Sequence, residues 1–229
     1  MKQIFTDKKD LARALVIILE LFAVGIIIYL IILPFYPRIK YEISYNKESA
    51  KEEAKDLEKT KEKVQEIIRE TKEQEANKEK NENNNDNNAE NKIVIPTSGN
   101  RLIITKIGVN APIIESENEN YGLSRGSWHL PDSSTPDKGG NTVITGHRFK
   151  YLPPNNVTFY LLDKLEEGDI ISVVWDDKEY YYRVKETKIV GKTETSVLNK
   201  SEEPILTLFT CHPIYSEENR LVVVAELVN

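Results

Sequence analysis

Cysteine is almost absent from this chain of 229 residues, which contains a single one, Cys211. One thiol excludes an internal disulfide, so in an exported protein it indicates either pairing between molecules or a free reactive group. The alternative is a small apolar residue in a core, which is the usual place of a free cysteine.

Metal ligands are also scarce. The chain has three histidines, His129, His147 and His212, and their spacing with the cysteine matches no recognised zinc pattern. We therefore predict no zinc centre and no cofactor. The formal net charge is −6, and we expect no nucleic-acid partner, because such partners favour basic surfaces.

The sequence contains a single long apolar run. Residues 11–33 are almost wholly apolar and long enough to cross a bilayer as a helix. A cleavable signal peptide would have a shorter apolar region and a small-residue cleavage site, whereas this run is followed by prolines and aromatic residues at 34–37. We expect a retained transmembrane signal anchor at 11–35.

Basic residues are more frequent before this span than after it. Lys2, Lys8, Lys9 and Arg13 precede the span, and Arg38 and Lys40 follow it. The bias predicts a cytoplasmic N-terminus, residues 1–10, and a single-pass protein of the cell membrane whose remaining residues are extracellular.

Glycine and proline are absent from residues 47–80, which are rich in Glu, Lys and Ala. This composition favours a helix with i,i+4 charge pairs, and we expect a charged, solvated helical stalk at 36–80. A faint heptad favours a coiled coil only weakly, because its positions include polar residues and alanines: Ala50, Ala54, Leu57, Lys61, Val64, Ile68 and Thr71. The Asn-rich segment that follows, 81–97, is predicted to be a flexible linker.

From residue 98 onward the sequence consists of short β-forming runs separated by Gly, Pro, Asn and Asp. Runs that we predict as strands lie at 101–109, 141–147, 169–175, 179–190, 205–211 and 220–228, with a shorter one at 93–96. This spacing predicts one all-β barrel or sandwich. We assign residues 98–229 to this domain.

Three residue types suited to acyl transfer stand at the ends of these runs. His147 ends the run 141–147, Cys211 ends the run 205–211, and Arg220 opens the next. If the last two runs pair as antiparallel neighbours, Cys211 and Arg220 lie together. A thiolate could then attack a carbonyl, an imidazole could move protons, and a guanidinium could donate to the oxyanion.

These residues resemble the motifs of the sortases, the Gram-positive cell-surface cysteine transpeptidases. The matching features are Thr207-Leu208-Phe209-Thr210-Cys211, the following Arg220, the upstream Gly146-His147, and the opening segment 101–114. The resemblance covers roughly residues 98–228, and it implies an eight-stranded sortase-type β-barrel.

The resemblance also implies roles for individual residues. Cys211 would be the nucleophile, His147 the general acid/base, and Arg220 the group that stabilises the oxyanion or holds the substrate backbone. Thr210 would contact the signal peptide. The enzyme would cleave an LPXTG-like or LAXTG-like signal of a surface protein between Thr and Gly, form a thioacyl intermediate, and transfer the protein to an amine of a peptidoglycan precursor or a pilin.

Within the family, the segment Cys211-His212-Pro213 and the pair Trp128-His129 are most similar to class E or class D enzymes, and no Asp-Pro-aromatic lid of the class C type precedes the barrel. We expect His129 to line the substrate groove, with a structural role as the alternative. Adjacent strand residues point to opposite faces, so His212 is expected to face away from Cys211.

Alternatives remain for the loop chemistry and for the reaction. Glu115, Glu117 and Glu119 could bind Ca²⁺, as loop carboxylates do in some sortases, or could form an ordinary solvated loop. The domain could also be an inactive barrel that binds sorting signals or wall polymer, or a cysteine peptidase that uses water as its acceptor.

Overall fold

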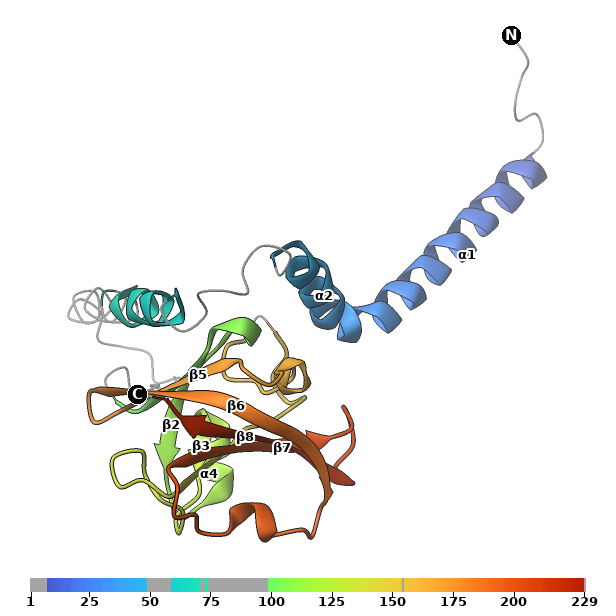
Figure 1. Cartoon of the computed structure of the whole chain (residues 1–229). Helices are drawn as coiled ribbons and strands as arrows, with labels where there is room; N and C mark the ends of the chain where they lie inside the picture. The colour runs from blue at the N-terminus through green and yellow to red at the C-terminus, as the bar shows by residue number, and fades with distance from the viewer. Residues whose placement is uncertain (1–7, 49–58, 71–72, 74–98, 154, 229) are drawn as a thin grey trace, which may run out of the picture. The chain divides into compact units, whose positions relative to one another are not determined.

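The computed structural model describes residues 8–48, 59–70, 73, 99–153 and 155–228 (Figure 1). The chain divides into two compact units, Met1–Lys47 and Glu48–Asn229, and each is described here by itself. The predicted linker at 81–97 and the predicted strand at 93–96 lie outside the described residues.

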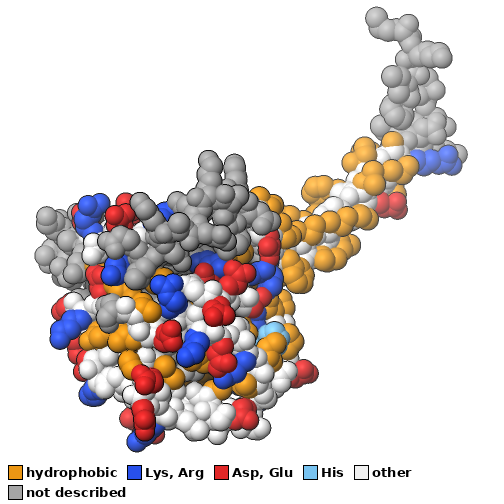
Figure 2. Space-filling view, in the orientation of Figure 1, with side chains coloured by type: hydrophobic (Ala, Val, Ile, Leu, Met, Phe, Trp, Pro, Cys, Tyr) orange, Lys and Arg blue, Asp and Glu red, His pale blue; other side chains and the backbone are white. Residues whose placement is uncertain are grey.

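The first unit is helical. Helix α1 (Lys8–Ile32) is followed by a 3₁₀ turn, η1 (Leu33–Phe35), that contains Pro34, and then by α2 (Tyr36–Glu48). Within the described residues, one helical run, Arg13–Ile43, is long and apolar enough to cross a membrane, with a mean hydropathy of 3.0 over its most apolar part. Its hydrophobic side chains are exposed along the helix (Figure 2), which is consistent with a membrane-spanning helix.

The second unit contains a closed antiparallel and parallel β-barrel. The described strands are β1 (Arg101–Ile104), β2 (Val109–Glu115), β3 (Ser127–His129), β4 (Asn141–Thr145), β5 (Ile170–Trp175), β6 (Lys178–Gly191), β7 (Ile205–His212) and β8 (Asn219–Leu227). Their order around the barrel is β1-β2-β3-β4-β7-β8-β6-β5. The prediction of an eight-stranded all-β barrel is confirmed.

The opening run of the barrel differs from the prediction of one strand at 101–109. A 3₁₀ turn, η3 (Thr105–Ile107), separates β1 from β2, and Gly108 closes it with φ 69°. Glycine adopts this left-handed backbone without steric cost, so the chain reverses here and β2 pairs antiparallel with β1. The three-residue strand β3 was not predicted, because so short a segment shows no clear alternation.

Buried aliphatic and aromatic side chains of several strands, and of the loop that contains Phe159 and Tyr160, cover both faces of the barrel wall. Residues with no exposed surface include Leu102, Ile104, Val143, Ile144, Phe159, Tyr160, Ile171, Val173, Leu206, Leu208, Val222 and Val223. They come from opposite sides of the barrel, so the hydrophobic core is continuous and keeps the strand ends in fixed positions.

A helical segment at 59–70 packs on the outside of the barrel. Val64 has no exposed surface and contacts a cluster formed by Ile103, Ile170 and Tyr181, and the Lys61 ammonium lies 5.4 Å from the Tyr181 ring centroid. One face of 59–70 is therefore packed against the barrel, while most of its other side chains are exposed or partly exposed, and the helical stalk at 36–80 stays a prediction. The predicted heptad positions Lys61, Val64 and Ile68 face β1, β5 and β6 rather than a second stalk helix.

Candidate active site

Strands β7 and β8 bring the cysteine and the arginine together. The two strands are antiparallel neighbours, and Cys211 is directly paired with Arg220. Directly opposed residues of an antiparallel pair project to the same face, so the thiol and the guanidinium start from adjacent backbone positions on one side of the sheet. The sequence predicted that Cys211 and Arg220 would lie close together if these two strands paired, and the strands do pair in this way.

The histidine reaches the same level from strand β4. Strands β4 and β7 are parallel, and the last pair in their register is Thr145 with Phe209. Continuing the register by two residues places His147 level with Cys211. Two neighbouring strands and one segment distant in sequence thus present Cys211, Arg220 and His147 at one rim of the barrel.

Side-chain hydrogen bonds continue the β4–β7 pairing beyond the end of β4. The Thr145 hydroxyl donates to the Phe209 carbonyl at 2.8 Å, and the Thr210 hydroxyl donates to the Gly146 carbonyl at 2.7 Å. The main chain of His147 is held from the other side, because the Phe159 amide donates to its carbonyl at 2.9 Å. These bonds fix the backbone that carries the imidazole.

Gly146 makes this close approach possible. A Cβ atom at this position would lie 2.9 Å from Cδ1 of the Phe159 ring, closer than real Cβ atoms come. The Gly-His pair of the sequence motif therefore has a packing reason: glycine lets the His147 segment lie directly on the buried Phe159 ring.

The environment of Cys211 favours a protonated thiol in the free protein. Burial raises the pKa of the thiol above its usual range, and the Arg220 guanidinium opposes that shift. The side chain is partly exposed, so a reactant could reach it.

His147 is shifted in the complementary direction. Burial lowers the pKa of its imidazole, as does the nearby Lys150, while Glu217 acts in the opposite sense. The ring lies edge-on to Tyr151, with 6.0 Å between centroids. Both shifts favour a neutral pair in which the imidazole can accept the thiol proton.

The arginine is oriented by the loop between β7 and β8. One Arg220 nitrogen, Nη1, donates to the carbonyls of Glu217 at 3.1 Å and Asn219 at 3.0 Å. The Glu217 carboxylate in turn lies 3.9 Å from the Lys192 ammonium. The guanidinium is therefore held beside Cys211 by the backbone of its own loop, an arrangement that can present its other donors to a substrate oxygen.

The two predicted substrate-binding residues have partners inside the barrel. His129 is 5% exposed; its Nε2 lies 2.9 Å from the Ser134 carbonyl and 3.0 Å from the Ser133 hydroxyl. Thr210 is 1% exposed and uses its hydroxyl on Gly146. Contact of either residue with a signal peptide stays a prediction, and the observed geometry gives both a structural role.

His212 and Arg148 form the buried side of the same rim. The Arg148 guanidinium lies 2.8 Å from Nδ1 of His212, and the side chain of Arg148 is 1% exposed. The same guanidinium donates to the main-chain carbonyl of Cys211 at 3.3 Å, and the expectation that the His212 ring faces away from the thiol stays a prediction. Sequence reasoning passed over Arg148, although it directly follows His147 in the motif and is the largest fully buried side chain.

The acidic residues Glu115, Glu117 and Glu119 do not belong to a single loop. Glu115 ends β2, whereas Glu119 opens helix α4 (Glu119–Arg125), which is capped by Asn118. No group of three or more His, Cys, Asp or Glu side chains in the described part of the chain could hold a metal ion. Calcium binding through Glu115, Glu117 and Glu119 stays a prediction.

Comparisons with known proteins agree with the barrel and its rim. The crystal structure of sortase C-1 from Actinomyces oris is 30% identical, with a TM-score of 0.51 over 57% of this chain and 73% of that one. Sortase A from Corynebacterium diphtheriae is 28% identical, with a TM-score of 0.51 over 57% of this chain and 60% of that one. These similarities define the fold as that of the sortases.

Sequence comparisons carry the assignment to the family. The model of the sortase domain matches residues 102–228, and the chain therefore belongs to the sortase family. Sortase D of Bacillus subtilis (strain 168) is 36% identical over 115 residues, which are 49% of this chain and 53% of that protein. Sortase SrtE1 of Streptomyces coelicolor is 30% identical over 149 residues, 58% of this chain and 41% of that protein. The chain thus spans about half the length of the first of these relatives and less of the second.

Proposed function

We propose that this sortase cleaves an LPXTG-like or LAXTG-like sorting signal between Thr and Gly and transfers the protein to an amine. The observation that carries the proposal is the common level of three residues: Cys211 pairs with Arg220 across β7 and β8, and the β4–β7 register brings His147 to the same rim.

The reaction follows from these positions. His147 accepts the proton of the Cys211 thiol, and the sulfur attacks the threonine carbonyl carbon. Arg220 donates to the oxyanion that forms, or holds the signal's backbone. The imidazolium then protonates the leaving glycine amine, which leaves a thioester on Cys211. An incoming amine, deprotonated by His147, attacks the thioester, and the thiol is restored as the new amide forms.

The proposed site of action is the outer face of the membrane. The apolar run Arg13–Ile43 supports a single-pass anchor, and the excess of basic residues before it supports a cytoplasmic N-terminus. Surface proteins with C-terminal signals are the proposed donors, and a peptidoglycan precursor or pilin amine is the proposed acceptor. Solved relatives include "Sortase C1 of GBS Pilus Island 1".

The test uses the full-length protein in detergent micelles. Fluorogenic LPXTG and LAXTG peptides are incubated with and without a glycine-based amine, next to Cys211→Ala and a matched loop control, Glu218→Ala, whose side chain is exposed. We expect amine-dependent product, full activity in the control, and no product in Cys211→Ala.

Two other results would contradict the proposal. Cleavage whose products do not change with the amine would indicate a peptidase. A folded protein that cleaves neither peptide and forms no thioacyl adduct by mass spectrometry would indicate a binding barrel without turnover.

A further inference from the structure

Arg148 is a buried cation placed between the segments that carry the proposed catalytic residues. It directly follows His147, and its side chain is 1% exposed. A charge is seldom buried so completely without several partners, so the contacts of the guanidinium indicate what it holds in place.

The guanidinium contacts strand β7 at two points. Its Nη1 donates to the main-chain carbonyl of Cys211 at 3.3 Å and lies 2.8 Å from Nδ1 of His212. Burial and the neighbouring Arg148 charge lower the pKa of His212, so the ring is neutral and its Nδ1 can accept from the arginine.

The other end of the guanidinium is anchored in a third segment. Its Nη2 lies 2.8 Å from Oδ1 of Asp163, which belongs to the 3₁₀ turn η4 (Leu162–Lys164). A planar guanidinium with donors in a fixed fork can hold three such groups in one geometry, whereas a lysine ammonium cannot reproduce the fork.

These contacts extend the bonds of Thr145 and Thr210 by one more step along the β4–β7 seam. Thr145 holds Phe209, Thr210 holds Gly146, and Arg148 holds Cys211. Each bond crosses between the two strands that carry the imidazole and the thiol. The last one reaches the backbone of the nucleophile itself.

We propose that Arg148 is a positioning residue that fixes the distance between His147 and Cys211 from the buried side of the rim. The inference rests on the proposed transpeptidase function of these residues. Arg148 touches no reacting atom; it acts by holding the main chain of Cys211, the ring of His212 and the turn at Asp163 in one arrangement. A misplacement of about 1 Å can cost about 100-fold in rate.

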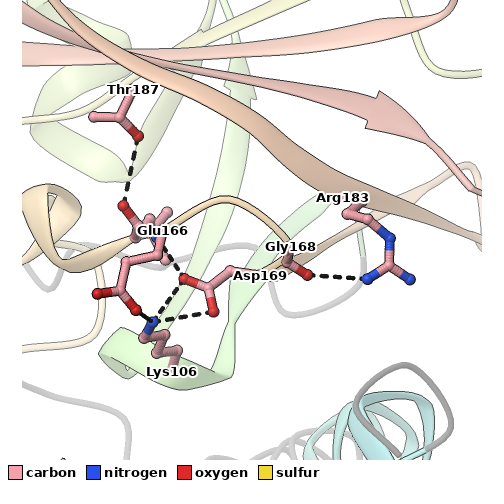
Figure 3. Close-up of polar contacts among 7 residues, drawn as sticks. Lys106, Glu166, Gly168, Asp169, Arg183 and Thr187 are labelled. Atoms are coloured by element: carbon pink, nitrogen blue, oxygen red, sulfur yellow. Dashed lines mark hydrogen bonds and ion pairs between the residues drawn. The ribbon is translucent and has the colours of Figure 1, made fainter. Parts of the chain in front are cut away.

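A second buried cation provides a matched control. The Lys106 ammonium lies 2.8 Å from Oε2 of Glu166 and 2.8 Å from Oδ2 of Asp169, and its side chain is 14% exposed (Figure 3). These residues lie in η3 and before β5, and β5 pairs with β1 and β6 rather than with β4 or β7. Loss of this cation should destabilise the barrel without moving the catalytic rim.

The experiment compares Arg148→Met, Arg148→Lys, Asp163→Asn and Lys106→Met in the full-length protein, each at a temperature where it is folded. We expect kcat to fall about 100-fold in Arg148→Met with KM within about twofold, to fall less in Arg148→Lys and Asp163→Asn, and to stay unchanged in Lys106→Met.

The second readout needs no peptide. The rate at which iodoacetamide alkylates Cys211 at neutral pH should fall about tenfold in His147→Ala, because the thiol loses its proton acceptor. Although burial raises the pKa of the Cys211 thiol, the Arg148 charge itself lowers it, so the comparison uses Arg148→Lys, which keeps the charge. Arg148→Lys should also lose alkylation rate, and Arg148→Lys combined with His147→Ala should show no further loss than His147→Ala alone, because both act through the same pair. A wild-type protein that cleaves no peptide would overturn the proposed function, while the alkylation series would still test Arg148.

Three outcomes would overturn the inference: unchanged kcat and alkylation in a folded Arg148 variant, losses that add to those of His147→Ala, or an equal loss of kcat in Lys106→Met. If Arg148→Met does not fold, Arg148→Lys and Asp163→Asn decide between positioning and general stabilisation by the same measurements.

Discussion

Arg148, which is buried, and Lys106, which is largely buried, look alike by local criteria and differ in what they hold. Arg148 and Lys106 each lie 2.8 Å from an aspartate oxygen, and both side chains are largely buried. Lys106 joins η3 to the turn that leads into β5. Arg148 joins the His147 segment, the end of β7 and η4. Burial and charge pairing therefore do not distinguish a structural cation from a positioning one; the strands that it connects do.

The surroundings of Lys106 show what a local brace looks like. Its carboxylate partners are themselves tied together, since the Glu166 amide donates to Oδ2 of Asp169 at 2.7 Å (Figure 3). Arg183 donates to the Gly168 carbonyl at 3.1 Å in the same turn. Burial raises the pKa of Asp169, which shows that even with Lys106 nearby the desolvation of this carboxylate dominates. The network stabilises one turn.

The largest expected effect is on the free energy of unfolding, which we expect to fall more when Arg148 is replaced than when Lys106 is. Removing one partner of a buried ion pair costs about 3–5 kcal/mol, and we expect a loss of this size for Arg148→Met. Lys106→Met should cost less, because Lys106 is 14% exposed against 1% for Arg148, and one of its two carboxylate partners, Glu166, is 70% exposed. Urea unfolding followed by the fluorescence of Trp128 and Trp175 measures both. An equal or larger loss for Lys106→Met would contradict this ranking.

The next test alters the packing beneath His147 and leaves all charges at the rim unchanged. Gly146→Ala places a methyl group 2.9 Å from Phe159, and overpacking of this kind costs about 1–3 kcal/mol. The displaced His147 should lower kcat about tenfold. The matched control is Gly191→Ala, whose new methyl group would meet no atom within 4 Å. Normal peptide turnover by Gly146→Ala would mean that the rim tolerates displacement.

A third substitution tests the side of the barrel that carries no proposed catalytic residue. Val64→Ala in the segment 59–70 removes a side chain with no exposed surface from the cluster around Tyr181. The expected loss is about 2 kcal/mol in urea unfolding, with kcat unchanged. The exposed neighbour Gln65 supplies the control, because Gln65→Ala should alter neither quantity. A loss of kcat in Val64→Ala would connect this face to the site.

The pH dependence of activity follows from the two shifted groups. Because the pKa of His147 is lowered and that of Cys211 raised, the neutral pair persists across neutral pH. We expect kcat/KM to be flat there, with an acid limb below the usual histidine value of about 6.5 and an alkaline limb above the usual cysteine value. A profile that peaks narrowly near neutral pH would mean that the two pKa values lie close together.

The smallest expected effect concerns acid stability. The folded-state pKa of His212 lies below its unfolded value, so its contribution to stability is present above about pH 6.5 and is lost as pH falls toward the folded value. Arg148 adds to this depression after burial. The loss of stability between neutral and mildly acidic pH should therefore be shallower in Arg148→Met than in Lys106→Met, as measured by thermal melts across that range.

Much of the barrel could be predicted because its strands follow simple patterns. The runs at 141–147, 205–211 and 220–228 correspond to β4, β7 and β8, and the pairing of Cys211 with Arg220 follows from the short loop between the last two. The position of His147 beside Cys211 was harder to predict. It depends on a parallel pairing of β4 with β7 across a long crossover, which local sequence does not encode.

The rest depended on tertiary contacts. Residues 59–70 have the composition of a solvated helix, and only the complementary surface around Tyr181 shows where Val64 is buried. Arg148 reads as a surface residue by type, and its burial becomes visible only when Asp163 and His212 are placed around it. The acidic residues near 115 gave a loop prediction, whereas Asn118 starts a helix there.

The alternation of side chains at the end of β7 has a consequence for how the sequence can change. Cys211 lies on one face of the strand, and Thr210 and His212 lie on the other, where they bond to Gly146 and Arg148. Inserting or deleting one residue in β7 would exchange the faces and direct the thiol inward. Two residues would restore the phase. A change of one residue in the length of this strand would therefore break the buried bonds of Thr210 and Arg148, whereas a change of two would keep the faces but move Cys211 along the strand, away from Arg220.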